Sequence, residues 1–320
     1  MQLLSTRLPR PFQGALRRLS ALMASAAILM GLAACGAPAA HAAPPKLQVR
    51  DDLGRLVTLA HPAQRLVVLQ PSGFEIADAL GLRKDIVGAA TAIPTYTPAP
   101  WKTAAQHLPS VGTSYPGISV ERVVARRPDL VIATTGISGL KGLEALHIPV
   151  LILNPQSVAA VYHDIQLVGT LTGTRSRART VVQRLQSQMN ALAAQAKRRP
   201  TRPLVFYDLG GLYTAGPHTF VSSLIQMAGG VNLGARLSHA QYPQVTAEQV
   251  VAGNPAIILV DPNATSVAKE KQIAGFSTTE AARTGRIEAV PNSAYVNEPS
   301  LGLVQGLTEL IRLIHPHALK

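Results

Sequence analysis

The 320-residue sequence predicts an α/β fold built in two halves that are joined by one long helix. Short apolar runs alternate with helical stretches along most of the chain. One long helical pattern over residues 176–197 divides these runs into two groups, and residues 115–130 recur in similar form as residues 242–257. Apolar residues make up 47% of the chain, which excludes intrinsic disorder and provides for a sizeable core.

The chain begins with a segment typical of an export signal. Residues 1–34 contain four arginines and no acidic residue, and an apolar run fills residues 19–34. The run ends in LAACG at residues 32–36, which resembles a bacterial lipobox, where the cysteine becomes the first residue of the mature protein and carries lipid. We therefore expect Cys35 to anchor an exported protein to a membrane. Cleavage after Ala42, at an Ala-x-Ala site, is the alternative and would release a soluble periplasmic protein.

Residues 35–50 are rich in alanine and proline and are expected to form a flexible tether. An N-terminal α/β half follows over residues 51–157, with buried strands expected at 65–69, 129–133 and 150–153 and a helix over 74–82. Continuous apolar strands separated by helices are typical of sheets that helices cover on both faces.

The linking segment, residues 158–200, contains the long helical pattern. Its apolar residues recur every three or four positions, so that one stripe of the helix faces a core. The pattern ends at a basic stop, residues 197–200, where the cations suit a helix C-terminus and the proline prevents continuation. The C-terminal half, residues 201–320, repeats the alternation, with strands expected at 204–207 and 256–260.

The internal repeat pairs Tyr115 with Tyr242 and Glu121 with Glu248. Each copy predicts a Tyr-Pro loop, a hydroxyl N-cap, a helix with glutamate in its first turn, a proline stop and a buried strand. Singly, each glutamate offsets its helix dipole and each tyrosine packs against its own loop. As pairs, the glutamates suit a two-point docking surface for a basic partner, and the tyrosines could face one another across a cleft.

Other segments, together with the repeat, carry a resemblance to a known family. They are DLGR (52–55), QRLVVL (64–69), FEIADALG (74–81), LYTAG (212–216) and MAGGVN (227–232). In their order and spacing around one long helix, they resemble the metal-chelate and vitamin B12 class of ABC-transporter periplasmic solute-binding proteins.

The resemblance implies two rigid Rossmann-like lobes, a shallow ligand cleft between them and little hinge closure. It implies that Glu121 and Glu248 dock on arginines of an inner-membrane ABC permease that works with an ATPase. Cleft aromatics of the vitamin B12 members match Tyr115, Tyr213 and Tyr242, and Tyr295 lies in a matching late loop. Thr134 stands where those members carry an aromatic residue. Glu75, in the helix after the first strand, is expected to cap that helix or face solvent.

The expected function is therefore that of a monomeric receptor that carries no cofactor of its own and captures a ferric siderophore or a corrinoid. Tyrosines offer flat apolar faces for such ligands, and Arg83 or Arg236 could attract an anionic chelate. Haem is an alternative, because tyrosinate can ligate ferric iron and His239 lies near Tyr242 in sequence, although a solvated loop histidine is the simpler interpretation.

Several other classes are excluded or disfavoured. The single cysteine excludes a disulfide scaffold, a cysteine-ligated zinc site and an iron–sulfur cluster. An exported α/β enzyme is the rival class, but no nucleophile elbow, phosphate-binding loop or zinc-protease helix is present, so we predict neither catalytic residues nor a resident metal. The net charge of +13 does not indicate nucleic-acid binding, because the basic clusters lack interleaved aromatics.

Overall fold

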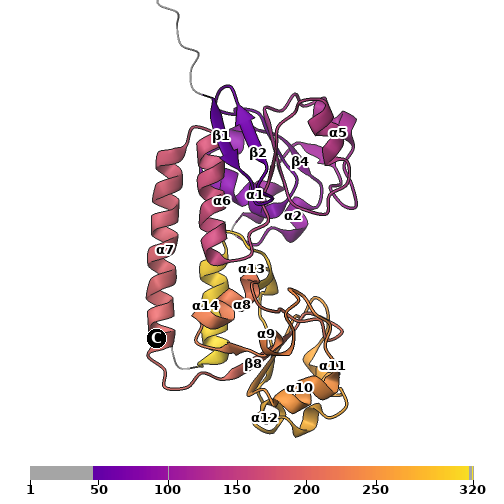
Figure 1. The fold of residues 1–320 in the computed structure, drawn as a ribbon, viewed down its shortest axis with the longest axis vertical. Helices are drawn as coiled ribbons and strands as arrows, with labels where there is room; N and C mark the ends of the chain where they lie inside the picture. The colour runs from indigo at the N-terminus through magenta and orange to yellow at the C-terminus, as the bar shows by residue number, and fades with distance from the viewer. Residues whose placement is uncertain (1–45, 100, 317–318, 320) are drawn as a thin grey trace, which may run out of the picture. The chain divides into compact units, whose positions relative to one another are not determined.

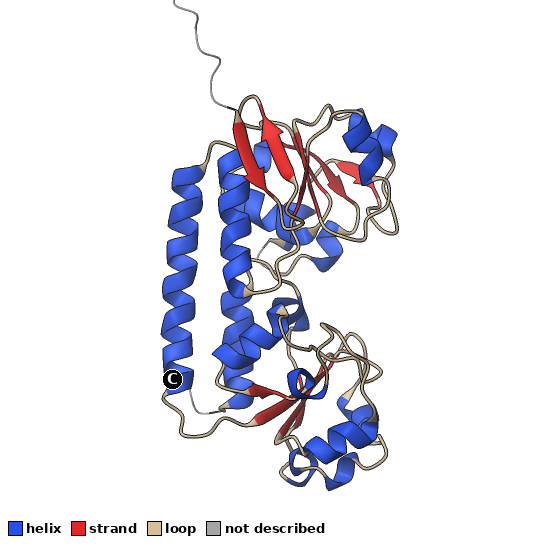
Figure 2. Ribbon diagram, viewed as in Figure 1, coloured by secondary structure: helices blue, strands red, loops and turns tan. Residues whose placement is uncertain are grey.

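The computed structural model describes residues 46–99, 101–316 and 319. The export signal (1–34), Cys35 and most of the expected tether lie outside these residues. The predicted α/β class is confirmed, with most of the strands gathered into two separate parallel sheets and the first two strands in an antiparallel hairpin (Figure 2). The described residues form one compact unit.

The first sheet has strand order β5-β4-β3-β6-β7, and all its pairings are parallel. Its strands are β3 (Leu66–Val68), β4 (Ile86–Ala90), β5 (Ser110–Gly112), β6 (Leu130–Ala133) and β7 (Val150–Ile152). Around it lie α1 (Pro71–Ala79), the 3₁₀ turn η1 (Arg83–Asp85), α2 (Ile93–Tyr96), α3 (Lys102–Ala105), α4 (Val120–Val124) and α5 (Leu140–Ala145). Every residue of β3, β6 and β7 is buried, as expected of parallel strands covered on both faces.

The second sheet has strand order β11-β10-β8-β9 and is also parallel. Its strands are β8 (Leu204–Asp208), β9 (Val231–Asn232), β10 (Ile257–Val260) and β11 (Ile287–Ala289). Its helices are α8 (Phe220–Met227), α9 (Gly234–Leu237), α10 (Ala247–Gly253), α11 (Val267–Glu270), the 3₁₀ turn η2 (Phe276–Thr278), α12 (Glu280–Arg283), α13 (Ser293–Asn297) and α14 (Leu303–Ile314).

Two long helices lie between the sheets in sequence (Figure 1). They are α6 (Val158–Leu171) and α7 (Arg175–Lys197), which confirms the predicted long helix to within one residue. They pack against each other, and α7 also packs against α14 at the end of the chain. The apolar stripe of α7 is buried, with Met189 fully enclosed.

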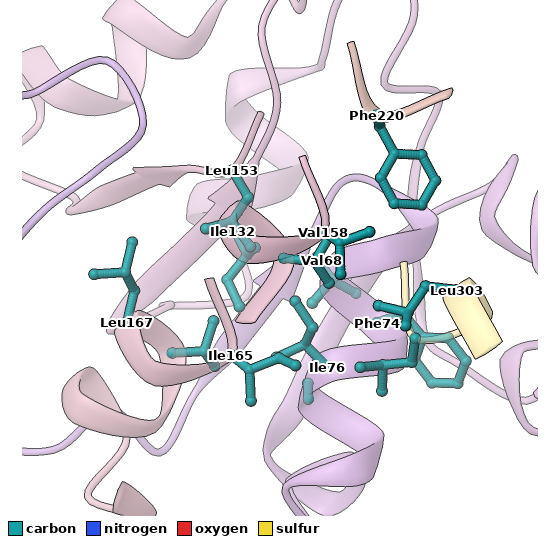
Figure 3. Close-up of a cluster of buried hydrophobic side chains, with 14 of the residues drawn as sticks. Val68, Phe74, Ile76, Ile132, Leu153, Val158, Ile165, Leu167, Phe220 and Leu303 are labelled. Carbon is teal, nitrogen blue, oxygen red and sulfur yellow. The ribbon is translucent and has the colours of Figure 1, made fainter. Parts of the chain in front are cut away.

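One buried cluster contains residues of both sheets. Val68, Phe74 and Ile132 of the first half share it with Phe220 of α8 and Leu303 of α14 (Figure 3). A second, smaller cluster lies within the C-terminal half around β10 and η2. The two sheets are therefore connected by a continuous apolar core as well as by the helix pair.

The expected tether is too long by four residues. Leu47–Arg50 form strand β1, which pairs antiparallel with β2 (Leu56–Leu59). Asp51 closes the hairpin by accepting hydrogen bonds from the backbone N–H groups of Leu53 (3.0 Å) and Arg55 (2.9 Å). Because β1 packs against α6, these residues are part of the fold.

The internal repeat is also a repeat in backbone geometry. Arg127 and Asn254 occupy matching positions, each immediately before the proline stop, and both have positive φ, at 47° and 45°. Such values are uncommon in residues other than glycine, so their recurrence at the same position supports a common local structure.

Candidate functional site

All four predicted cleft tyrosines follow the carboxyl ends of parallel strands. Tyr115 follows β5, Tyr213 follows β8, Tyr242 follows β9 and α9, and Tyr295 lies in α13 after β11. In open α/β sheets this edge is where ligands bind. Three of the four are exposed: Tyr115 over 77% of its surface, and Tyr213 and Tyr242 each over about half, 48%.

Tyr213 and Tyr242 are brought together by a short antiparallel ladder. The backbone N–H of Thr214 donates to Pro243 O at 3.0 Å, and that of Gly216 donates to Gln241 O at 2.6 Å. In this register Tyr213 lies opposite Gln244. Since side chains two residues apart on one strand point the same way, Tyr213 and Tyr242 share one face of the ladder as diagonal neighbours.

The Tyr213 loop is anchored at the end of β8. The buried Asp208 carboxylate accepts hydrogen bonds from the N–H groups of Gly210 (2.8 Å) and Leu212 (3.0 Å). The close approach of the two ladder segments requires glycine at 216, because a Cβ there would lie 1.8 Å from the carbonyl oxygen of Ala240. The backbone of the loop that carries the exposed Tyr213 is therefore held in place on both sides.

Tyr115 is presented by a separate loop of the N-terminal half. The Thr113 hydroxyl donates to the carbonyl of Tyr115 at 2.7 Å, and Gly117 pairs with Ser138 in the loop after β6. The ring is free of packing over most of its surface. A ring exposed to this degree on a fixed loop is available for a flat ligand.

Tyr295 differs from the other three tyrosines. Its hydroxyl donates to the carbonyl oxygen of Ala99, and its ring lies so close to Gly302 that a Cβ there would be 2.5 Å from ring Cδ1. Burial raises the pKa of this phenol, and the charges of Glu309 and Glu75 raise it further. The side chain therefore links α13 to the segment between α2 and α3.

Further contacts bring the edges of the two sheets together. The Gln241 side-chain N–H₂ donates to Gln156 Oε1 at 3.3 Å, which joins the Tyr242 loop to the segment after β7. Tyr96, which sequence reasoning did not select, lies at the end of α2 after the carboxyl end of β4 and is 62% exposed. Tyr96 therefore joins the set of exposed aromatics on these edges.

The predicted arginines have different positions. Arg236, on α9, and His239 are both exposed and lie a few residues before Tyr242. Arg83 begins η1, which precedes β4, so it lies at the amino end of the sheet and pairs with Asp78 at 2.6 Å. The expectation that Arg83 could attract a ligand in the cleft is therefore wrong, because the tyrosines are on the opposite edge.

Glu75 is also not where the sequence suggested. It is fully buried in α1, and its Oε2 accepts a hydrogen bond from the N–H of Leu301 at 3.1 Å. Its Oε1 has no partner among the described residues. Burial raises its pKa to about 8. Phe74, Ile76 and Ala77 surround it on the circumference of the helix, and this lack of a polar side was the available signal that the turn is enclosed.

Another carboxylate, Glu298, lies near Tyr242. Burial is the larger reason that the pKa of Tyr242 is raised, and the charge of Glu298 raises it further. The pKa of Glu298 is itself raised by burial. The tyrosine therefore stays protonated and keeps its hydroxyl as a hydrogen-bond donor.

The two repeat glutamates have matching surroundings. Glu121 and Glu248 are each the second residue of a short helix, α4 or α10, whose N-cap is Ser119 or Thr246. Both are exposed. The backbone N–H of each glutamate and the hydroxyl of its N-cap hold the pKa of its carboxyl below the usual value. Both are therefore exposed, fully ionised anions at equivalent places in the two halves.

The described residues contain no group of three or more histidine, cysteine, aspartate or glutamate side chains arranged to hold a metal ion. Over the same part of the chain, no helix is long and apolar enough to cross a bilayer. The predicted lipid-bearing Cys35 lies outside the described residues. The chemistry available on the described edges is aromatic stacking and hydrogen bonding from tyrosine hydroxyls.

Comparison with known proteins gives consistent matches. Residues 66–294 match the periplasmic binding protein family. The chain is 29% identical over 277 residues to a cobalamin-binding protein of Halobacterium salinarum, covering 83% of this chain and 73% of that protein. It is 31% identical over 210 residues to a vitamin B12-binding protein of Yersinia pestis, covering 64% and 72%. The apo structure of RhuT, a periplasmic haem-binding protein from Roseiflexus sp. RS-1, superposes with a TM-score of 0.68 at 25% identity, covering 80% of this chain and 100% of that one. The chain belongs to the periplasmic binding protein family.

Proposed function

We propose that this protein is the exported receptor of an ABC importer and binds a corrinoid against tyrosines on the facing edges of its two sheets. The observation that carries this proposal is the arrangement of Tyr213 and Tyr242 on one face of a rigid ladder, with the adjacent Gln241 bonded to Gln156 of the other half. Both curated relatives above are named for cobalamin or vitamin B12.

The side chains on these edges favour a neutral macrocycle. Tyr115, Tyr213 and Tyr242 present apolar faces with hydroxyl donors, which suit a flat ring with amide acceptors at its rim. Glu298 places a carboxyl near Tyr242, which gives a polyanionic chelate no cationic partner at that point. A ferric siderophore and haem are the other ligands to be tested.

We propose that Glu121 and Glu248 dock the loaded receptor on basic residues of the inner-membrane permease, which its ATPase drives. Matched, exposed and ionised carboxylates on two halves of one rigid body would fix both position and orientation of the partner. In this proposal the chain is a monomer and has no enzymatic activity.

The proposed organisation is an N-terminal lobe (51–157), a linking segment (158–200) and a C-terminal lobe (201–320), held at the cell envelope through lipid on Cys35. The export signal and the lipobox-like segment support this location. Cys35→Ser should abolish incorporation of labelled lipid, and continued labelling would contradict the anchor.

Ligand identity is tested by calorimetric titration of the purified chain with cyanocobalamin, haemin and ferric siderophores. We expect cyanocobalamin to bind, and Tyr213→Ala and Tyr242→Ala each to weaken binding about tenfold. Tyr162→Phe, a half-buried position on α6, is the control and should leave affinity unchanged. Binding of haemin or a siderophore alone would reject the corrinoid, and binding of none would reject the receptor assignment.

Docking is tested with the double variant Glu121→Arg and Glu248→Arg. Uptake should be lost while ligand affinity stays at the wild-type value. Glu280→Arg is a matched control, because Glu280 is also an exposed acid in the first turn of a short helix capped by threonine. Equal loss of uptake in the control, or loss of ligand affinity in the double variant, would contradict the docking role.

A further inference from the structure

A long stretch of the chain around α7 carries basic charge with no acidic residue. Residues 165–207 contain eight lysines and arginines and neither aspartate nor glutamate. Four of these cations, Arg175, Arg177, Arg179 and Arg184, are exposed on the N-terminal half of α7. At about 100° per residue, Arg175 and Arg179 lie on one flank of the exposed side of α7, and Arg177 and Arg184 lie on the other flank. We call the exposed side that these four residues border the α7 arginine face.

Helix stability does not account for this face. The amino end of a helix carries partial positive charge, so Arg175 and Arg177 in the first turn of α7 are unfavourable by about 0.3–1 kcal/mol each. The N-cap Thr174 makes no side-chain cap that would compensate. None of the four arginines has an ion pair among the described residues. Arg177 donates to Ala79 O at 3.0 Å and so caps the end of α1, but the other three arginines have no such role in the described part of the chain. Their charges point to a partner outside the chain.

The surface on both sides of the face suits phosphate groups. Between α6 and α7 lies a cavity of about 250 Å³, lined by Gln166, Thr170, Ala178 and the guanidinium-bearing Arg175 and Arg179. Arg175 Nε–H donates to the Thr170 hydroxyl at 3.4 Å, so several hydrogen-bond donors lie together in the lining of this cavity. No acidic side chain lines this cavity.

On the other side, Arg177 and Arg184 border a cavity of about 440 Å³ that also contains Trp101. Trp101 is half-buried against the core, and its exposed part adds an aromatic edge of the kind found at the headgroup level of a bilayer. One acid, Asp78, lines this cavity, and its carboxylate is already paired with Arg83.

The tether enters the fold beside the same helices. The chain joins the fold at β1, β1 packs against α6, and α6 packs against α7. A lipid on Cys35 would be a dozen residues from Leu47, and an extended chain spans at most about 3.5 Å per residue, or roughly 40 Å. A bilayer that held Cys35 would thus lie within reach of the α7 arginine face.

We propose that the α7 arginine face is a docking surface for the anionic phospholipid bilayer that holds the anchor. This surface is formed by elements other than those of the repeat glutamates, because α7 packs against α6 and α14 while Glu121 and Glu248 lie on α4 and α10. Contact with lipid phosphates keeps the undocked receptor at the membrane, independently of its ligand.

The test uses a chain beginning at Gly36, which carries no lipid and retains the compact unit of the described residues. Co-sedimentation is measured with vesicles of phosphatidylglycerol and with vesicles of phosphatidylcholine, at low and physiological salt. Each basic residue near an anionic surface contributes about fivefold to the binding constant. The triple variant Arg175→Gln, Arg179→Gln and Arg184→Gln should therefore bind phosphatidylglycerol roughly a hundredfold more weakly.

The matched control is the triple variant Lys141→Gln, Lys269→Gln and Lys271→Gln. It removes the same amount of charge at exposed positions that do not lie on α7. It should bind within about twofold of the wild type. If both triple variants bound phosphatidylglycerol equally weakly, net charge alone would explain the attraction, and the proposal would be overturned. Equal binding to phosphatidylcholine, or no binding of the wild type to phosphatidylglycerol, would overturn it as well.

Discussion

Replacing the buried Glu75 by glutamine should change how the stability of the protein depends on pH. The carboxyl has a pKa of about 8 in the folded chain against an ordinary value of 4.5. Between these values the folded protein keeps a proton that the unfolded chain has lost, so ionisation favours the unfolded state. The wild type should therefore lose stability as pH rises from about 4.5 to 8, relative to a neutral side chain at this position.

The magnitude follows from the size of the shift. Each pH unit in this window corresponds to about 1.4 kcal/mol, which gives on the order of 5 kcal/mol across the whole window. Glu75→Gln mimics the protonated acid, since its carbonyl can still accept from Leu301 N–H. The variant should match the wild type near pH 4.5 and become progressively more stable than it toward pH 8.

The assay is urea unfolding followed by circular dichroism at pH 5, 6, 7 and 8 for both proteins. Asp164 and Glu270 are other buried carboxyls with raised pKa values, of about 9 and about 8. They are present in both chains, so the difference between the proteins isolates Glu75. A difference that stays constant with pH, or that favours the wild type as pH rises, would refute the reasoning.

Three other substitutions test the scaffold of the site. Thr246→Ala removes the N-cap of α10, so stability should fall by about 1 kcal/mol and the pKa of Glu248 should rise in an NMR titration; an unchanged pKa would contradict the capping hydroxyl as a cause. Gly216→Ala forces the ladder apart, so we expect a loss of about 1–3 kcal/mol in urea unfolding and weaker ligand binding, and full affinity would contradict the dependence of the site on this ladder. Met189→Ala opens a cavity under α7 and should lower stability by about 2–5 kcal/mol, while Gln186→Ala on the exposed side should have almost no effect; equal effects would contradict the burial pattern.

Sequence periodicity predicted the strands that are buried along their whole length and the helix that has one continuous buried stripe. The strands at β3, β6, β7 and β10 are apolar throughout because both faces are covered, and α7 has a continuous stripe, so their positions could be predicted closely. The short strands β5 and β11 have partly exposed residues and no such signal. Their existence depends on pairing with neighbours distant in sequence, which local pattern does not report.

The candidate site could be predicted only where a sequence pattern marks its residues. The repeat predicts Tyr115 and Tyr242 as a matched pair, and their loops do follow the carboxyl ends of strands. Tyr96 has no repeat partner in the sequence, and its position became apparent only once β4 was placed. Arg83 and Glu75 were misjudged because charge alone indicates neither the edge of the sheet nor the burial of a side chain.

The shared core of Phe74, Phe220 and Leu303 has a consequence for transport. If the two halves closed around a ligand by a hinge motion, this apolar cluster would be exposed to water in the open or the closed state. The free-energy cost would be about 25 cal/mol for each Å² of apolar surface uncovered. A core shared by both halves therefore favours the same relative position of the two halves with and without ligand. A partner that docks on Glu121 and Glu248 would then meet the same two charges on empty and loaded receptors, and would have to sense the cargo itself to avoid futile cycles.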